Sequence, residues 1–90
     1  MGTAEARREY EEFREQNVRD WLSERVVVNP IARTPIALVT KDYTEWCKKR
    51  GFTPSSAIIF NVVLEAEGFV RWALRVKGKV CKVWLRLELR

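Results

Sequence analysis

Residues 32–51 bring together side chains that can take part in chemistry. Tyr43, Trp46 and Cys47 lie within five residues of one another, and three basic residues follow directly at 48–50. One interpretation is a reactive thiol beside positive charge, or an aromatic platform on which a base stacks. The other is that these side chains form the buried stripe of a helix. We favour the buried stripe, because positions 43, 46 and 47 follow the three- and four-residue spacing of a helix face.

Other chemical sites find little support in the sequence. The chain has no histidine, so it lacks the commonest general base and metal ligand and every Ser-His or Cys-His nucleophile pair. Cys47 and Cys81 match no zinc-binding spacing. They would either form a disulfide or remain two buried free thiols, and we favour the thiols. The four glycines are isolated, so no glycine-rich phosphate loop is present. We therefore expect no catalytic residue, no metal and no cofactor, and a chain that is not an enzyme by itself.

Positive charge is concentrated toward the C-terminus. The formal net charge is +5, made up of −3 over residues 1–24, +2 over residues 25–68 and +6 over residues 69–90. This distribution favours a polyanion as partner, although a charged strand face that keeps the protein in solution would look similar. No apolar run reaches the roughly 18 residues that a membrane helix needs. We expect one cytoplasmic domain over residues 1–90, with no membrane partner.

Two helices are expected in the first half of the chain. Apolar residues at helical spacing predict the first over residues 5–26, before Asn29-Pro30. The second is predicted over residues 35–50, with Thr34 as its N-cap and Gly51 as a left-handed residue after its end.

A third helix is expected over residues 54–67, with Thr53 as its N-cap and Gly68 after its end. Only two or three residues would separate it from the second helix, which is the tight connection of a helix-turn-helix. Strict alternation then predicts a β-hairpin with strands at 69–77 and 79–89, joined by the turn Lys77-Gly78-Lys79.

The two faces of this hairpin differ in character. One face is apolar and is expected to pack on the helices. The other is expected to carry Arg71, Arg75, Lys82, Trp84 and Arg86. The fold class is therefore predicted to be α+β, and the architecture a winged helix-turn-helix with a C-terminal hairpin as its wing and a possible short first strand near residues 32–34.

Candidate DNA contacts come from the wing and from the start of the third helix. Cations of the wing would meet phosphates and Trp84 would stack on an unpaired base, or pack on neighbouring arginine stems instead. Hydroxyl and amide side chains of the third helix would add hydrogen bonds. The candidates are Arg71, Arg75, Lys77, Lys79, Lys82, Arg86, Trp84, Ser55, Ser56 and Asn61.

A family resemblance extends over most of the chain, from Val18 to Leu89. An Arg-x-Pro segment leads into Tyr-x-x-Trp-Cys and a glycine; a Pro-Ser helix start, a Gly-Phe pair and an alternating hairpin follow. The positions are Arg33, Pro35, Tyr43, Trp46, Cys47, Gly51, Pro54, Ser55, Phe60, Leu64, Gly68, Phe69, Trp84, Leu85 and Leu87. This pattern resembles the C-terminal winged-helix domain of primase–helicases from phages, plasmids and large DNA viruses. The resemblance implies a DNA-associated module of a replication protein whose other domains hold the polymerase and ATPase chemistry.

One departure from that family limits what the third helix can do. Family members often place Lys or Arg in its first turns, whereas residues 56–59 are Ser-Ala-Ile-Ile here. An arginine fork to guanine is therefore not available from this helix. We expect binding to single- or double-stranded DNA with weak sequence specificity.

Two alternatives remain open from the sequence. Ile58 and Ile59 would let the third helix dock a partner protein or a second copy of the chain. The chain would also fit a small free-standing transcription regulator. In the preferred reading its partners are DNA and the other domains of the parent replication protein.

Overall fold

The chain forms three helices and a three-stranded antiparallel sheet, which confirms the predicted α+β class. The computed structural model describes the backbone of residues 4–90 and the side chains from residue 14 onward. The elements are α1 (Ala4–Arg25), β1 (Val26–Pro35), α2 (Ile36–Arg50), α3 (Ala57–Ala66), β2 (Val70–Val76) and β3 (Lys79–Leu89). The strand order is β1-β3-β2, so β3 is the central strand.

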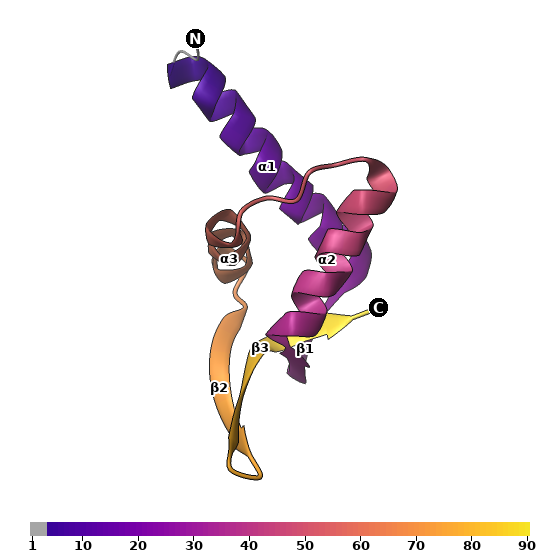
Figure 1. The fold of residues 1–90 in the computed structure, drawn as a ribbon, viewed down its shortest axis with the longest axis vertical. Helices are drawn as coiled ribbons and strands as arrows, with labels where there is room; N and C mark the ends of the chain where they lie inside the picture. The colour runs from indigo at the N-terminus through magenta and orange to yellow at the C-terminus, as the bar shows by residue number, and fades with distance from the viewer. Residues whose placement is uncertain (1–3) are drawn as a thin grey trace.

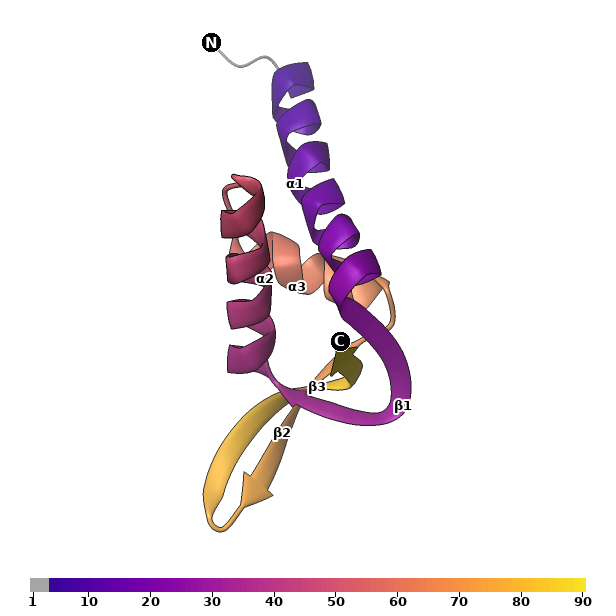
Figure 2. The ribbon, with the colours of Figure 1, turned by 90° about the vertical axis from the view of Figure 1, so that its right-hand side faces the viewer.

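The hairpin of β2 and β3 projects away from the helices, as Figure 1 and Figure 2 show from two sides. The N-terminal end of α1 lies at the opposite end of the molecule, which measures 52 × 23 × 21 Å along its principal axes. The buried core lies between the three helices and the base of the sheet, with Trp21, Leu64, Trp84 and Leu87 among its fully buried side chains. The far half of the hairpin is therefore outside the core.

Helices α1 and α2 are joined by two reciprocal hydrogen bonds from indoles to carboxylates. Trp21 of α1 donates through Nε1 to Asp42 Oδ2 at 2.9 Å, and Trp46 of α2 donates through Nε1 to Glu24 Oε2 at 2.8 Å. Arg25 also donates to both carboxylate oxygens of Asp42, at 3.2 and 3.0 Å. Charge-assisted bonds of this kind are stronger than neutral ones, and they fix the two helices that support the sheet.

The first strand is longer than the sequence predicted. Helix α1 ends at Arg25 and β1 follows without a loop, whereas the sequence suggested a helix to residue 26 and a strand only near 32–34. The run Val26-Val27-Val28 favours extended backbone, since β-branched side chains are restricted in a helix. Thr34 is not the N-cap of α2: it lies in β1, and its hydroxyl donates to the Leu87 carbonyl at 2.5 Å.

The third helix starts later than predicted, at Ala57 instead of residue 54. Its N-cap is Ser56, whose Oγ accepts the Ile59 N–H at 3.3 Å, and not Thr53. The connection from α2 is six residues long, 51–56, so the predicted two- or three-residue turn is wrong. The helix-ending glycines are confirmed, with Gly51 at φ 73° and Gly68 at φ 94°.

A β-bulge where β1 pairs with β3 decides which face of the hairpin meets the helices. Val28 pairs with Leu87 and Arg33 pairs with Leu85, so residues 29–32 of β1 lie opposite the single residue Arg86. Arg86 has a left-handed φ of 71°. This left-handed residue, within the register shift between the two strands, moves the alternation of β3 by one position. Trp84 before the bulge and Leu87 after it are therefore both fully buried in the core.

The predicted assignment of the hairpin faces is consequently wrong. Paired residues of an antiparallel sheet share a face, so the partners of Trp84 define the side turned toward the helices, here called the inner face. That face carries Arg71, Ala73 and Arg75 of β2 opposite Trp84, Lys82 and Val80 of β3. The apolar set, here called the outer face, turns away from the helices. It comprises Val70, Trp72 and Leu74 opposite Leu85, Val83 and Cys81.

The Asp42 carboxylate makes stability dependent on pH. Burial raises its pKa, but hydrogen bonds from Arg25 and Trp21 outweigh burial, and the pKa ends below its ordinary value. A lowered pKa contributes stability above the unfolded-state pKa of about 3.9, and that stability is lost as pH falls through the folded-state value.

We expect Asp42→Asn to reduce the free energy of unfolding by about 1–3 kcal/mol at pH 7. The deficit should shrink below pH ~4, as followed by urea unfolding at several pH values. Asp20→Asn, at an exposed site, is the control, and a deficit that is constant with pH would contradict the role of the carboxylate.

The bulge predicts an unusual pattern of substitutions at residue 86. Glycine adopts a positive φ freely, whereas a β-branched residue does so at high cost. We expect Arg86→Gly to leave the melting temperature unchanged or raised, and Arg86→Val to destabilise the fold by about 1–2 kcal/mol. At an ordinary strand position the order is reversed, because valine is favoured over glycine there. Thermal unfolding of the two variants distinguishes the cases, and greater stability of the valine variant would argue against the bulge.

Candidate nucleic-acid interface

The tip of the hairpin is a tight two-residue turn that holds basic side chains in solvent. Lys77 and Gly78 are its central residues, with φ of 52° and 80°, and Val76 pairs with Lys79 across it. Two positive φ values in succession are the signature of the type I′ turn, which matches the twist of the flanking strands. All residues from 75 to 80 are exposed. The predicted turn is thereby confirmed.

Four cations around this tip have no acidic partner. Arg75, Lys77, Lys79 and Lys82 form neither an ion pair nor a side-chain hydrogen bond with any residue whose side chain is described. The sequence contains no acid from Gly68 to Leu87. Like charges held on a narrow projection in solvent create a positive potential that attracts polyanions.

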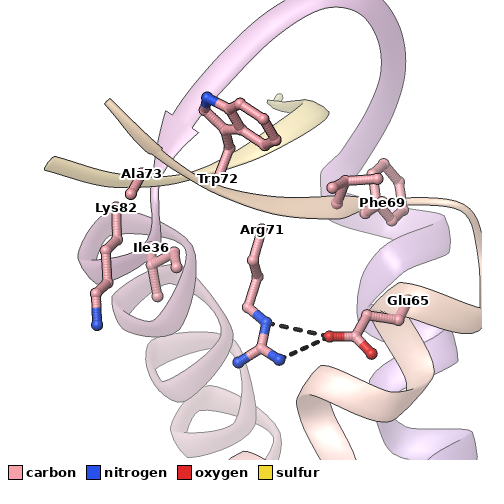
Figure 3. A pocket seen from close by; sticks show the side chains of 8 residues that line it. Ile36, Glu65, Phe69, Arg71, Trp72, Ala73 and Lys82 are labelled. Atoms are coloured by element: carbon pink, nitrogen blue, oxygen red, sulfur yellow. Dashed lines mark hydrogen bonds and ion pairs between the residues drawn. The ribbon is translucent and has the colours of Figure 1, made fainter. Parts of the chain in front are cut away.

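Arg71 differs from these four cations because it is neutralised within the molecule. Its NH2 and Nε lie 2.8 and 3.1 Å from Glu65 Oε1 of α3 (Figure 3). The guanidinium carbon also lies 5.9 Å from the centre of the Trp84 ring. Both partners of the ion pair are half exposed, so the pair is worth at most about 1 kcal/mol and is easily exchanged for another anion.

A hollow of about 610 Å³ lies between the hairpin and the N-terminal end of α2. Ile36, Phe69 and Ala73 line it together with the Arg71–Glu65 pair. Lys82 reaches it from β3 and lies beside Ile36 in Figure 3. The inner face of the hairpin thus offers one free ammonium group and one exchangeable guanidinium to an anion entering the hollow.

Trp84 does not lie on the surface where the sequence placed it. Its side chain is 0% exposed, so it cannot stack on a base. Its Nε1 is buried with no hydrogen-bond partner among the described residues. The interpretation of Trp84 as a residue packed beside arginine is closer, since Arg71 lies across its ring. Trp72, which sequence reasoning passed over as a core residue, is 55% exposed.

The three DNA contacts predicted near the third helix differ in how accessible they are. Ser55 is buried: its N–H donates to the Tyr43 hydroxyl and its Oγ donates to the Arg14 carbonyl, both at 2.9 Å. It therefore has no surface to offer DNA. Ser56 is exposed but already caps α3. Asn61 is half-buried in the groove between α2 and α3.

The aromatic and thiol cluster at residues 43–47 is the inner stripe of α2. Tyr43, Trp46 and Cys47 are all buried in the core. The Tyr43 hydroxyl and the Cys47 thiol both donate to Asn17 Oδ1, at 3.0 and 3.5 Å. Burial raises the pKa of the Cys47 thiol, which disfavours the reactive thiolate. The preference for a core stripe is confirmed.

The two cysteines are free thiols and lie on different sides of the sheet. Cys47 belongs to the core, whereas Cys81 is half-buried on the outer face. The bulge separates them, because it turns the predicted inward position of Cys81 outward. Within the described part of the chain, no three acids or cysteines gather as a metal site would require.

On α3 the exposed apolar side chains are Ile58 and Val62. Ile58 is 77% exposed, as the sequence suggested, while Ile59 is half-buried and packs against the core. Val62 follows Ile58 by four residues and lies on the same face of the helix. The surface that α3 offers a partner is thus apolar, with Glu65 one turn further along.

Comparison with known proteins adds no family assignment. No protein-family model, no curated protein and no solved structure matches the chain. Over residues 4–90, no helix is both long and apolar enough to cross a bilayer.

Proposed function

We propose that the chain is a winged-helix module that binds DNA, mainly through the hairpin of β2 and β3. The element order, with α1, β1, α2, α3, β2 and β3 in sequence and the strands arranged β1-β3-β2, supports the winged-helix assignment. The projection of the hairpin beyond the helices supports its role as a wing (Figure 1). The module has no catalytic task of its own in this proposal.

The observation that carries the proposal is the set of unpaired cations at the wing tip. Arg75, Lys77, Lys79 and Lys82 fall within eight residues of sequence and have no acidic partner among the described side chains. Cations that neutralise phosphates release condensed counterions, and this release drives binding at low salt. A cation held in an internal ion pair would have to break that pair before it could bind a phosphate. These four cations form no such pair with the described side chains.

The third helix is expected to contribute little to base reading. It carries Glu65 in its last turns, Glu67 follows it, and it has neither Lys nor Arg. Carboxylates repel phosphates, and the residues that read guanine best are absent. The proposed binding is therefore to the DNA backbone, with little dependence on sequence.

The setting we propose is a replication primase–helicase of a mobile element. The sequence resemblance supports this setting, and other domains of such a protein would supply the polymerase and ATPase chemistry. A protein-interaction or dimerisation module is the second candidate, because Ile58 and Val62 present an apolar patch on α3. A free-standing transcription regulator is less favoured, since α3 lacks side chains for direct base readout.

Neutralising the wing tip tests the proposal. Lys77→Gln with Lys79→Gln should make the slope of log affinity against log salt less steep by about 1.8 on duplex DNA, since each phosphate contact contributes about 0.9. Fluorescence anisotropy with a labelled duplex at several salt concentrations measures this slope. Lys48→Gln with Lys49→Gln removes the same charge from the far end of α2 and is the matched control. Equal losses in both variants, or no salt-sensitive binding by the natural chain, would overturn the proposal.

Releasing Arg71 should have the opposite effect. Glu65→Gln removes the carboxylate that occupies the Arg71 guanidinium, and we expect affinity for duplex DNA to rise with a slope steeper by up to about 0.9. Glu67→Gln changes the net charge equally but leaves the Arg71 pair intact, since Glu67 faces Arg19 at 3.9 Å. If the two variants gain the same affinity, only net charge matters and Arg71 is not a DNA contact.

A further inference from the structure

The outer face of the hairpin exposes apolar side chains that the core does not use. Arg71 and Trp72 leave β2 on opposite sides, so Trp72 points away from the helices (Figure 3). Trp72 is 55% exposed, and Val70 and Val76 on the same face are 47% and 55% exposed. Large apolar side chains gathered in solvent on one face often mark a binding surface.

Beside this patch lies a hollow of about 430 Å³ between β3 and the bulged segment of β1. Val70 and Leu85 line it, and Ile31 lies at its edge with 86% of its surface exposed. Arg33 and Arg86 line the same hollow. Neither arginine forms an ion pair with any side chain that the structure describes.

We propose that the outer face is a binding site for single-stranded nucleic acid, with Trp72 stacking on an unpaired base and Arg33 and Arg86 contacting phosphates. Surfaces that bind single strands combine an exposed aromatic ring with nearby cations, and both are present here. A duplex is a poor occupant, because its bases are paired and stacked and leave no ring face for Trp72.

Charge separates this occupant from a second copy of the chain. The acid on the outer face is Glu88, which pairs with Val27 beyond the bulge. Two copies meeting through their outer faces would bring together four arginines against two glutamates. Burying unpaired guanidinium groups is costly, whereas a phosphodiester backbone supplies the missing negative charge. Burying Arg33 and Arg86 under an uncharged apolar protein surface carries the same cost.

The inference rests on the proposed affinity for nucleic acid and adds a second surface to it. The wing-tip lysines serve the phosphates of either form of DNA, whereas Trp72 distinguishes single strands from duplexes. Loss of the tip lysines and loss of Trp72 therefore have different consequences, which allows the two proposals to fail separately.

Tryptophan fluorescence offers a direct test, because Trp72 is the exposed one among the four tryptophans of the chain. Trp21 and Trp84 are 0% exposed and Trp46 is 8% exposed. Titration with oligo-thymidylate should quench the emission of the natural chain, and Trp72→Leu should abolish that quenching. By anisotropy, Trp72→Leu should weaken oligo-thymidylate binding about tenfold while changing duplex binding less than about twofold. Trp72→Phe keeps a stacking ring and should retain most of the affinity.

A second variant tests the arginines without disturbing the patch. Arg33→Gln with Arg86→Asn, where asparagine tolerates the positive φ of residue 86, should flatten the salt slope on oligo-thymidylate by about 1.4, from about 0.7 per contact.

The proposal is overturned if Trp72→Leu leaves oligo-thymidylate binding unchanged while the tip variant loses it, and the proposed function then stands. It is also overturned if Trp72→Leu weakens single-strand and duplex binding equally. Self-association of the natural chain that Trp72→Leu removes, seen by sedimentation, would assign the face to a second copy and overturn it too. Failure of the natural chain to bind either nucleic acid would overturn both proposals.

Discussion

The bulge between β1 and β3, where Arg86 adopts a left-handed backbone, controls what every other residue of the hairpin faces. Without it, strict alternation would bury residues 83, 85 and 87 against the helices, as the sequence pattern suggests. With it, Trp84 and Leu87 are buried together, and the strand turns the other way on its far side. A left-handed φ costs a non-glycine residue about 1–2 kcal/mol. Leu87 would be buried in either case, and full burial of one further large apolar side chain, here Trp84, contributes about 1.5–3 kcal/mol, which matches or exceeds that cost.

The bulge also determines how charge is distributed over the surface. It turns Arg71 and Lys82 toward α2 and α3, where Glu65 neutralises the first and leaves the second free. It exposes Trp72 and leaves the apolar side of β2 in solvent. Beyond the helices, Arg75, Lys77 and Lys79 are exposed whichever way the strand turns, because nothing covers either face there. The proposed affinity for DNA depends on this tip, whereas the proposed choice between single and double strands depends on the bulge.

Features specified by neighbouring residues could be predicted from the sequence. Gly51, Gly68 and the Lys77-Gly78 turn adopt the expected positive φ, and the stripe of Tyr43, Trp46 and Cys47 is buried as its spacing indicates. Features set by contacts between distant parts of the chain could not be predicted from the sequence. The alternation of β3 breaks at Arg86, and an arginine does not signal a left-handed backbone as a glycine would. The segment of β1 that pairs there lies more than 50 residues earlier in the chain. Ser55 resembles an exposed helix start, but Tyr43 and the Arg14 carbonyl take up its hydrogen bonds. Sequence alternation continued through the bulge places Trp84 in solvent, and it assigns the cations of the hairpin to the outer face for the same reason.

Nuclear Overhauser effects from the tryptophan rings would test the central claim that the bulge reverses the hairpin. If Arg86 shifts the alternation, the Trp84 ring protons should show strong contacts to methyl groups of the core cluster, of which Leu64 and Leu87 are members. The Trp72 ring should show contacts to Val83, its partner across the outer face, and none to the buried side chains of the helix core. Contacts from Trp72 and Leu85 to the helix core, with the Trp84 ring in solvent, would contradict the account and restore the unbroken alternation.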